Sequence, residues 1–196
     1  MDILHNEQNY PHPVQVFVKK INSVIRPYDV EWPSMFESIS CFLKANIKTY
    51  VGIEHVGSTS IPGMDAKPII DIDIEIRSVS DFDIVRKELE CIGYEYCGDQ
   101  GIEGREVFKR SGTKKSLLDD IAHHLYVCSS NSEEYQRHIL FRNRLRSDQS
   151  LMEEYKAIKH EILKRVGYDN KQAYVEAKQN NYKYFFDKVH KEPTKE

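Results

Sequence analysis

Apolar and acidic residues alternate without a break from residue 70 to residue 76, within the stretch "IIDIDIEI". Neighbouring side chains of an extended chain point to opposite faces, so this period of two predicts a β-strand. One face of the strand carries isoleucines and should pack on a core. The other face carries Asp71, Asp73 and Glu75, and the surroundings of that face decide what the strand does.

The rest of the chain divides into a mixed part and a helical part. Runs rich in β-branched and aromatic residues predict strands at 49–56, 94–97, 105–110 and 121–128. Apolar residues at helical spacing predict helices at 33–45, 80–92, 132–146, 150–166 and 170–189. We therefore expect four segments, namely an N-terminal extension (1–23), a core of strands and helices (24–130), C-terminal helices packed on that core (131–190) and a tail (191–196).

Charge and hydropathy exclude several classes of function. The chain has 196 residues and a formal net charge of −3, and its pI is near 6.3. This balance argues against a general attraction to nucleic acid or to anionic lipid. No apolar run has the length that spans a bilayer, and the N-terminus lacks the pattern of a signal peptide. We expect a cytoplasmic protein that binds neither nucleic acid nor membrane.

The acidic face of the strand has the spacing of a metal site. The Cα atoms of Asp71 and Asp73 would be roughly 6.6 Å apart, so both carboxylates can reach one hard divalent cation such as Mg²⁺. Two like charges this close are unfavourable without a cation between them. Glu75, about 13 Å from Asp71, is too far away to join them. The other interpretation is that these acids form the solvated face of an ordinary strand.

A turn of small residues precedes the acidic strand. Gly57 allows a positive φ or a close backbone approach, while Ser58 and Thr59 offer hydroxyl groups and backbone N–H groups. Such a turn can hold a phosphate, and Mg²⁺ commonly bridges carboxylates and the phosphates of a substrate. The turn could also be a plain connection, but the combination of turn and acidic pair is more specific than either part.

The spacing of the two motifs resembles a known superfamily. Val56, Gly57 and Ser58 are followed, after twelve residues, by Asp71-Ile72-Asp73, which is similar to the motif of nucleotidyltransferases of the DNA polymerase β type. From about residue 24 to residue 178 the chain resembles the GrpB family of bacterial proteins, which belongs to that superfamily. The resemblance is carried by "VIRPYDVEWPSMF", "IEHVGSTSIPGMDAKPIIDIDIEI", "GREVFKR", "HHLYV", "LFRNRLRSD" and "YVEAK".

The resemblance implies a fold and two alternative functions. The fold would be α+β, a nucleotidyltransferase-like mixed sheet with flanking helices and further helices added at the C-terminal end. Gly57 and Ser58 would hold the phosphates of a nucleoside triphosphate, and Asp71 and Asp73 would hold Mg²⁺, for transfer of a nucleotidyl group to a small-molecule acceptor. GrpB domains also occur attached to dephospho-CoA kinase, which implies the alternative of a non-catalytic module that binds nucleotide or assists a protein partner in folding.

Active members of the superfamily usually present a third carboxylate from a later strand, and here the natural candidate is 121–128. Alternation places His124 and Tyr126 on one face of this strand, and no acid lies within it. His124 can act as a metal ligand or a general base, or it can be a hydrogen-bonded histidine of a sheet face. Tyr126 would lie on the substrate side.

Cationic residues near the motifs complete the set of candidates. Lys67 and Arg105 would neutralise a triphosphate and the leaving pyrophosphate. Arg142 could bind an anionic substrate or pair with acidic neighbours. His55, directly before the turn, could contact the nucleotide or simply be packed at the end of a strand.

Overall fold

The computed structural model describes residues 24–112, 117–181 and 183–190, so the predicted extension (1–23) and tail (191–196) lie outside the described residues. The fold is built on one five-stranded sheet with the strand order β1-β2-β5-β4-β3. The strands are β1 (Gly52–Val56), β2 (Ile70–Ile76), β3 (Tyr94–Tyr96), β4 (Glu106–Arg110) and β5 (His123–Ser129). β2 and β5 are parallel and the other neighbours are antiparallel, so the sheet is mixed, as predicted.

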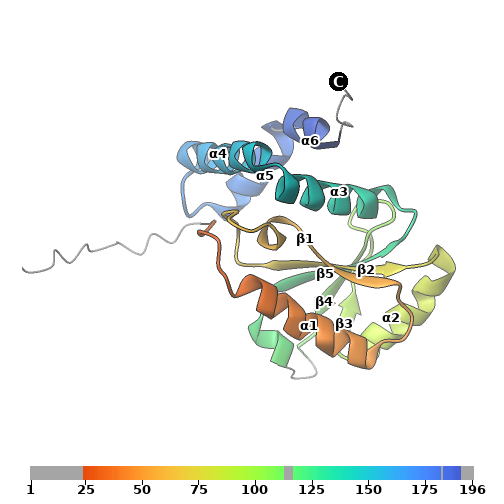
Figure 1. Cartoon of the computed structure of the whole chain (residues 1–196). Coiled ribbons are helices and arrows are strands. Elements are labelled where there is room, and N and C mark those ends of the chain that lie inside the picture. The colour runs from red at the N-terminus through yellow and green to blue at the C-terminus, as the bar shows by residue number, and fades with distance from the viewer. Residues whose placement is uncertain (1–23, 113–116, 182, 191–196) are drawn as a thin grey trace, which may run out of the picture.

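Helices cover both faces of the sheet, which confirms the predicted α+β class (Figure 1). The helices α1 (Trp32–Asn46) and α2 (Phe82–Cys91) lie on one face, and α3 (Glu133–Ser147) crosses the other. Beyond α3 lie α4 (Gln149–Val166), α5 (Lys171–Asn181) and α6 (Lys183–His190). In the described ranges, no helix combines the length and the apolar composition that a bilayer crossing requires.

The last predicted helix, 170–189, corresponds to two described helical segments, α5 and α6, on either side of residue 182, which lies outside the described residues. α5 contacts α4. α6 contacts α3 and also stacks Phe185 on Tyr155 of α4, with 5.0 Å between the ring centroids.

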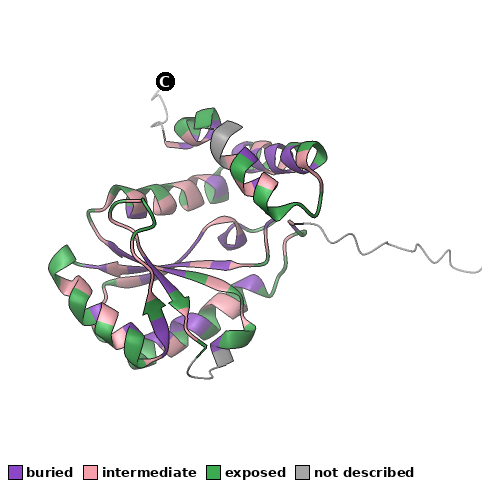
Figure 2. Cartoon of the chain, turned by 180° about the vertical axis from the view of Figure 1, so that it is seen from behind, coloured by how far each residue is buried: buried purple, intermediate pink, exposed green. Residues whose placement is uncertain are grey.

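Two apolar cores hold these layers together, and Figure 2 shows buried residues along the strands and on the inner sides of the helices. The first core lies between the sheet and α1 and α2, and it contains the four isoleucines of β2, as their alternation predicts. The second core lies among the C-terminal helices. It also takes in Ile61 and Met64 from the loop between β1 and β2. That loop is therefore fixed against the helices as well as against the sheet.

The junction between α3 and α4 places two helices over the same loop. Asp148 ends α3 and caps α4, because its side chain accepts a hydrogen bond from the backbone N–H of Leu151 at 3.0 Å. Ser132 caps the start of α3 by accepting from the N–H of Tyr135 at 3.2 Å. A single residue between the two helices makes a sharp corner, so side chains of both helices point toward the loop between β1 and β2.

We predict that Ile74→Ala lowers the free energy of unfolding by about 2–5 kcal/mol, because it removes a fully buried side chain from the first core. Ile84→Ala, on the exposed side of α2, is the matched control and should change it by about 0.5 kcal/mol or less. Urea unfolding followed by circular dichroism measures both. Equal effects of the two substitutions would contradict the assignment of the core.

Candidate active site

The backbone of the turn after β1 lies directly against the acidic strand. Gly57 has φ +69°, a left-handed conformation that favours glycine. A Cβ atom on Gly57 would be 2.3 Å from Oδ2 of Asp71, so a larger residue would require a movement of this carboxylate. After Gly57 the chain makes one 3₁₀ turn, Ser58–Ser60. The two motifs of the sequence are therefore in contact.

The C-terminal helices hold this turn from outside the sheet. Lys159 of α4 is buried and its Nζ donates to Ser58 Oγ at 2.8 Å and to the carbonyl oxygen of Asp65 at 2.7 Å. The guanidinium of Arg146, from α3, donates to the carbonyl oxygen of Ser60 at 2.7 and 2.9 Å. The side chain of Asp65 also contacts His160 of α4 at 2.7 Å. The shape of the turn thus depends on groups about 90 residues away in sequence.

The two aspartates of β2 lie beneath α3 and do not face bulk water. The side chain of Asp71 is 29% exposed, and its Oδ1 contacts Nδ1 of His124 at 2.8 Å. Asp73 is fully buried, its Oδ2 contacts Nδ1 of His138 at 2.8 Å, and its Oδ1 has no hydrogen-bond partner in the described structure. Burial raises the pKa of Asp73. The burial of Asp73 argues against the interpretation of this face of β2 as a solvated outer face.

His138 is a site residue that the sequence interpretation missed. Its ring bridges Asp73 and Glu134, which lies 3.2 Å from its Nε2. Burial alone would lower the pKa of His138, but hydrogen bonds to the two carboxylates outweigh it and raise the pKa to about 9. The imidazolium therefore offsets negative charge at the centre of the site. The i, i+4 spacing of Glu134 and His138 on one helix was a weak signal in the sequence.

The two aspartates fit a hard divalent cation whose remaining ligands come from a substrate and from water. The partnerless Oδ1 of Asp73 is a buried oxygen that a cation would satisfy, and Asp71 lies on the same face of β2. Across the part of the chain that the structure describes, no three His, Cys, Asp or Glu side chains form a complete metal site. Mg²⁺ typically takes one or two carboxylates and fills the remaining positions with phosphate oxygens and water. Two aspartates without a third ligand match that arrangement.

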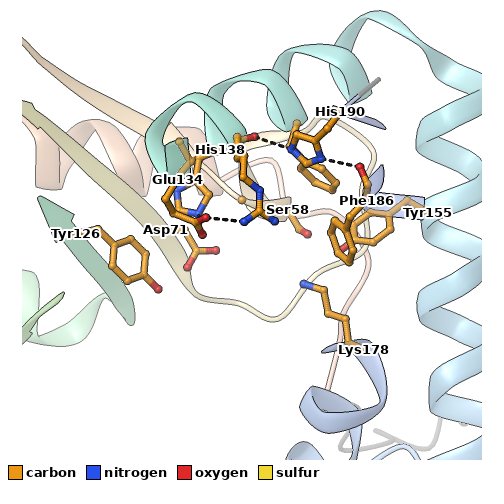
Figure 3. Close-up of a pocket in the computed structure, with 13 residues that line it drawn as sticks. Ser58, Asp71, Tyr126, Glu134, His138, Tyr155, Lys178, Phe186 and His190 are labelled. Atoms are coloured by element: carbon orange, nitrogen blue, oxygen red, sulfur yellow. Dashed lines mark hydrogen bonds and ion pairs between the residues drawn. The ribbon is translucent and has the colours of Figure 1, made fainter. Parts of the chain in front are cut away.

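Two cavities meet at the turn and share Ser58, Asp71 and Lys178. One, here called the basic cavity, has a volume of about 190 Å³. It is lined by Ile25, Ser58, Thr59, Ala66, Lys67, Ile69, Asp71, His124, Lys159, Tyr174 and Lys178. The other, here called the aromatic cavity, has a volume of about 280 Å³ and is drawn in Figure 3. It is lined by Val56, Gly57, Ser58, Asp71, Tyr126, Glu134, Arg137, His138, Phe141, Tyr155, Lys178, Phe186 and His190.

The basic cavity gathers three lysines around the turn. Lys67 comes from the loop before β2, Lys159 from α4 and Lys178 from α5, and within the described residues none of them forms an ion pair with a carboxylate. Burial lowers the pKa of Lys159 well below its usual range, and the charge of Lys178 adds to this effect. Burial also lowers the pKa of Lys67, again with a contribution from Lys178. Like charges held together in this way favour an anionic ligand.

Lys159 and Lys178 were not among the residues singled out from the sequence. Lys159 adjoins the apolar stripe of α4 and looks like an ordinary helical lysine. Lys178 ends the stretch "YVEAK", and Tyr174 of the same stretch also lines the basic cavity. The quoted stretch was the available signal, although its position in space depends on the packing of α5.

The structure brings most of the predicted residues to the cavities. Ser58 and Asp71 line both cavities, Lys67, Thr59 and His124 line the basic cavity, and Gly57 and Tyr126 line the aromatic one. The hydroxyl of Thr59 is buried, donates to the carbonyl of Ile69 at 3.3 Å and contacts His55, so it supports the turn from within. In the β2–β5 register, Tyr126 is opposite Asp73 and His124 is opposite Asp71. An aromatic side chain therefore stands beside the buried aspartate, where the motif calls for an acid.

Four predicted residues do not line either cavity, and one of them is the fully buried Asp73. The other three are Arg105, Arg142 and His55. Arg105 precedes β4 instead of lying within a strand as expected, and its guanidinium stacks on Tyr126 at 4.8 Å from the ring centroid. Arg142 forms an ion pair of 2.6 Å with Glu54 and donates to the carbonyl of His55 at 3.0 Å, which ties α3 to β1. His55 is buried and stacks on Phe36, with 4.8 Å between ring centroids. Direct contact of these three with a substrate stays a prediction.

Comparison with known proteins identifies the family of this chain. The model of the family described as GrpB protein matches residues 22–190. The chain belongs to the GrpB family. This confirms the resemblance inferred from the motifs, and the residues that line both cavities lie within the matched range.

Individual relatives support the assignment. The glutamate-rich protein GrpB of Alkalihalophilus pseudofirmus is 28% identical over 88% of this chain and 96% of its own length. UPF0157 protein YqkA of Bacillus subtilis is 34% identical over 69% of this chain, and the match spans only 38% of that protein. The crystal structure of the conserved protein GrpB from Enterococcus faecalis is 30% identical, with a TM-score of 0.67 over 85% of this chain and 94% of that one.

A more distant similarity concerns the fold alone. The Cid1 poly(U) polymerase with MgGTP bound is 16% identical, with a TM-score of 0.50 over 72% of this chain and 45% of that one. The fold of this chain is therefore similar to that of a nucleotidyltransferase, as the spacing of the two motifs predicts.

We predict that Gly57→Ala destabilises the protein more than a matched glycine substitution elsewhere. Gly101 also has a positive φ, +80°, but a Cβ atom there meets nothing within 4 Å. Both substitutions impose backbone strain, and only Gly57→Ala adds a clash with Asp71, which should cost about 1–3 kcal/mol more. Chemical unfolding of the two variants measures the difference, and equal losses would show that the turn does not press on Asp71.

We also predict a contribution of His55 to the pH dependence of stability. Burial lowers the pKa of His55 from its usual 6.5 to about 4, with a smaller contribution from Arg146. The unfolded chain therefore takes up this proton at higher pH than the folded chain, and stability is lost as the pH falls from about 6.5 toward 4. Between about pH 7.5 and about pH 5, the wild type should lose about 2 kcal/mol more than His55→Gln. Unfolding free energies at several pH values test this, and parallel curves would contradict it.

Proposed function

We propose that this chain is a metal-dependent nucleotidyltransferase, which moves a nucleotidyl group from a nucleoside triphosphate to a small-molecule acceptor. The observation that carries the proposal is the junction of the Gly57–Ser58 turn, the Asp71 carboxylate and three lysines at the basic cavity. The lysines suit a triphosphate, and the carboxylate suits the cation that accompanies it. The fold of the Cid1 polymerase, which was crystallised with MgGTP, supports this interpretation of the site.

Each part of the site has a separate task in this proposal. Ser58 and the backbone of the 3₁₀ turn would bind phosphate oxygens, and Lys67, Lys159 and Lys178 would neutralise the triphosphate and the departing pyrophosphate. Asp71 and Asp73 would hold Mg²⁺, which when bound stabilises negative charge on the phosphates and orients them. His124 contacts Asp71 and would fix the orientation of this carboxylate.

The reaction would be an in-line displacement. An oxygen or nitrogen of the acceptor forms a bond to the α-phosphorus, and the bond from that phosphorus to the pyrophosphate oxygen breaks. The pyrophosphate leaves with both electrons of the broken bond, and the acceptor loses one proton. The protein mainly supplies position and electrostatic stabilisation, because it contributes no covalent intermediate.

A second candidate function is a non-catalytic nucleotide-binding or protein-folding accessory module. The favouring observation is that Tyr126 stands opposite Asp73 where a third carboxylate is usual. His138 also offsets the charge of Asp73 without any metal. Under this alternative the basic cavity would still bind a nucleotide, but no pyrophosphate would be released. An assay of pyrophosphate release with a range of acceptors separates the two functions.

We predict that the wild type binds ATP, GTP or UTP in the presence of Mg²⁺ and that Asp71→Asn weakens this binding at least about tenfold, because a neutral amide no longer supports the cation. Asp83→Asn, an exposed position on α2, is the matched control and should leave the affinity unchanged. Isothermal titration calorimetry with and without Mg²⁺ measures both, after circular dichroism has shown that each variant is folded.

Two results would count against the proposal. If none of the three nucleotides binds, the assignment of the two motifs to a nucleotide site is contradicted. Binding that is independent of Mg²⁺ and equal in Asp71→Asn and wild type would place the nucleotide away from the two motifs.

A further inference from the structure

The aromatic cavity reaches the same carboxylate as the basic cavity but has a different chemical character. One of its walls consists of the rings of Phe141, Tyr155 and Phe186, which come from α3, α4 and α6. The ring centroid of Phe141 lies 5.3 Å from that of Tyr155 and 5.6 Å from that of Phe186. Figure 3 shows Tyr155 and Phe186 on one side of the cavity, with His190 and Lys178 near them, and Asp71, Glu134 and Tyr126 on the other side. Such a wall suits a flat or apolar ring.

The opposite wall is polar and rich in hydrogen-bond acceptors. Glu134 and Asp71 both face the cavity from this side, close to His138 and Tyr126. The carboxylate of Glu134 accepts from Arg137 at 2.8 Å and lies 3.2 Å from the ring of His138. A ligand that covers the aromatic wall therefore meets carboxylate oxygens at its other end.

We propose that the aromatic cavity binds the acceptor, and that this acceptor is a ring compound, neutral or amine-bearing, with a hydroxyl or amino group directed at Asp71. The inference rests on the proposed nucleotidyl transfer and names its second substrate class. It also assigns Glu134 as the group that contacts the hydroxyl or amino function of the acceptor.

The direction of the reaction places the acceptor in the aromatic cavity. In an in-line displacement, the attacking atom and the leaving group lie on opposite sides of the phosphorus. If the lysines of the basic cavity hold the pyrophosphate, then the acceptor approaches from the other side of Asp71. The aromatic cavity is the space that the structure offers there, because both cavities border Ser58, Asp71 and Lys178.

The charges that line the aromatic cavity favour a neutral or amine-bearing acceptor. Arg137 and His138 are cations of the aromatic cavity that are already paired with carboxylates, Arg137 with Glu134 and His138 with Asp73 and Glu134. Lys178 also borders the basic cavity, where a triphosphate would engage it. The described lining thus offers an acidic acceptor no lysine or arginine that a carboxylate or the triphosphate would not already engage, while carboxylates accept hydrogen bonds from hydroxyl and ammonium groups.

Glu134 also answers the question of the missing third carboxylate. β5 provides none, because Tyr126 occupies the position opposite Asp73. Glu134 comes from α3 and is connected to Asp73 through the ring of His138, which contacts both carboxylates. During transfer, the oxygen or nitrogen of the acceptor bonds to the α-phosphorus, the bond to pyrophosphate breaks, and the acceptor's proton passes to Glu134.

Two small probes with the same ring test the proposal on the full chain. Tyramine carries an amine, and 4-hydroxyphenylacetate carries a carboxylate at the equivalent place. Ligand-observed NMR, without nucleotide or metal, should detect saturable binding of tyramine and at least about fivefold weaker binding of 4-hydroxyphenylacetate. Glu134→Gln and Phe141→Leu should each weaken tyramine binding at least about fivefold, while Tyr168→Ala, an exposed aromatic outside both cavities, should not.

Several results would overturn the inference. Absence of tyramine binding, equal binding of the two probes, or no effect of Glu134→Gln in a folded variant would each do so. Displacement of tyramine by adenosine or uridine would assign the aromatic cavity to the nucleoside instead. Retained tyramine binding with no Mg²⁺-dependent nucleotide binding would refute the proposed transfer and leave the ring site standing, so the two failures are distinguishable.

Discussion

The hydrogen bonds of one buried side chain, Lys159, hold the site in its shape. Its nitrogen joins Ser58 and the carbonyl of Asp65, and so it connects the C-terminal helices to the loop between β1 and β2. A buried amine is costly unless its donors are paired, which makes this contact a strong constraint on where α4 can lie. Because α4 also carries Tyr155, the position of Lys159 helps to define both cavities. The helices beyond residue 131 therefore form part of the site as well as a cover for the sheet.

Charged side chains form two neighbouring groups beside the turn, the lysines of the basic cavity and the carboxylates beneath α3. Lys67 and Lys159 of the basic cavity have lowered pKa values because they are buried and close to the charge of Lys178. The carboxylates beneath α3 bring negative charges close together. His138, whose pKa is raised to about 9, offsets this negative charge. A bound anion would stabilise the lysines, and a bound cation would stabilise the carboxylates. A metal–nucleotide complex carries both kinds of charge, which is why the proposed substrate suits this site better than a simple anion or a free cation.

The sequence predicts the local parts of this structure well and the assembled parts poorly. Strict alternation places β2, and the spacing of Gly57 and Asp71 anticipates a contact that the glycine geometry makes necessary. Both are local or nearly local properties of the chain. His138 and Lys159 contact partners 65 and 101 residues away, and no periodicity in α3 or α4 distinguishes them from ordinary helical side chains. The packing of α5 on α4 and of α6 on α3 likewise depends on partners that a sequence pattern does not contain.

The most direct measurement is a crystal structure with a non-hydrolysable ATP analogue and Mn²⁺, located by its anomalous scattering. The account predicts the triphosphate in the basic cavity, in contact with Ser58, Lys159 and Lys178, and the metal bound by Asp71 and Asp73. A nucleotide bound elsewhere, or a metal that contacts neither aspartate, would contradict it.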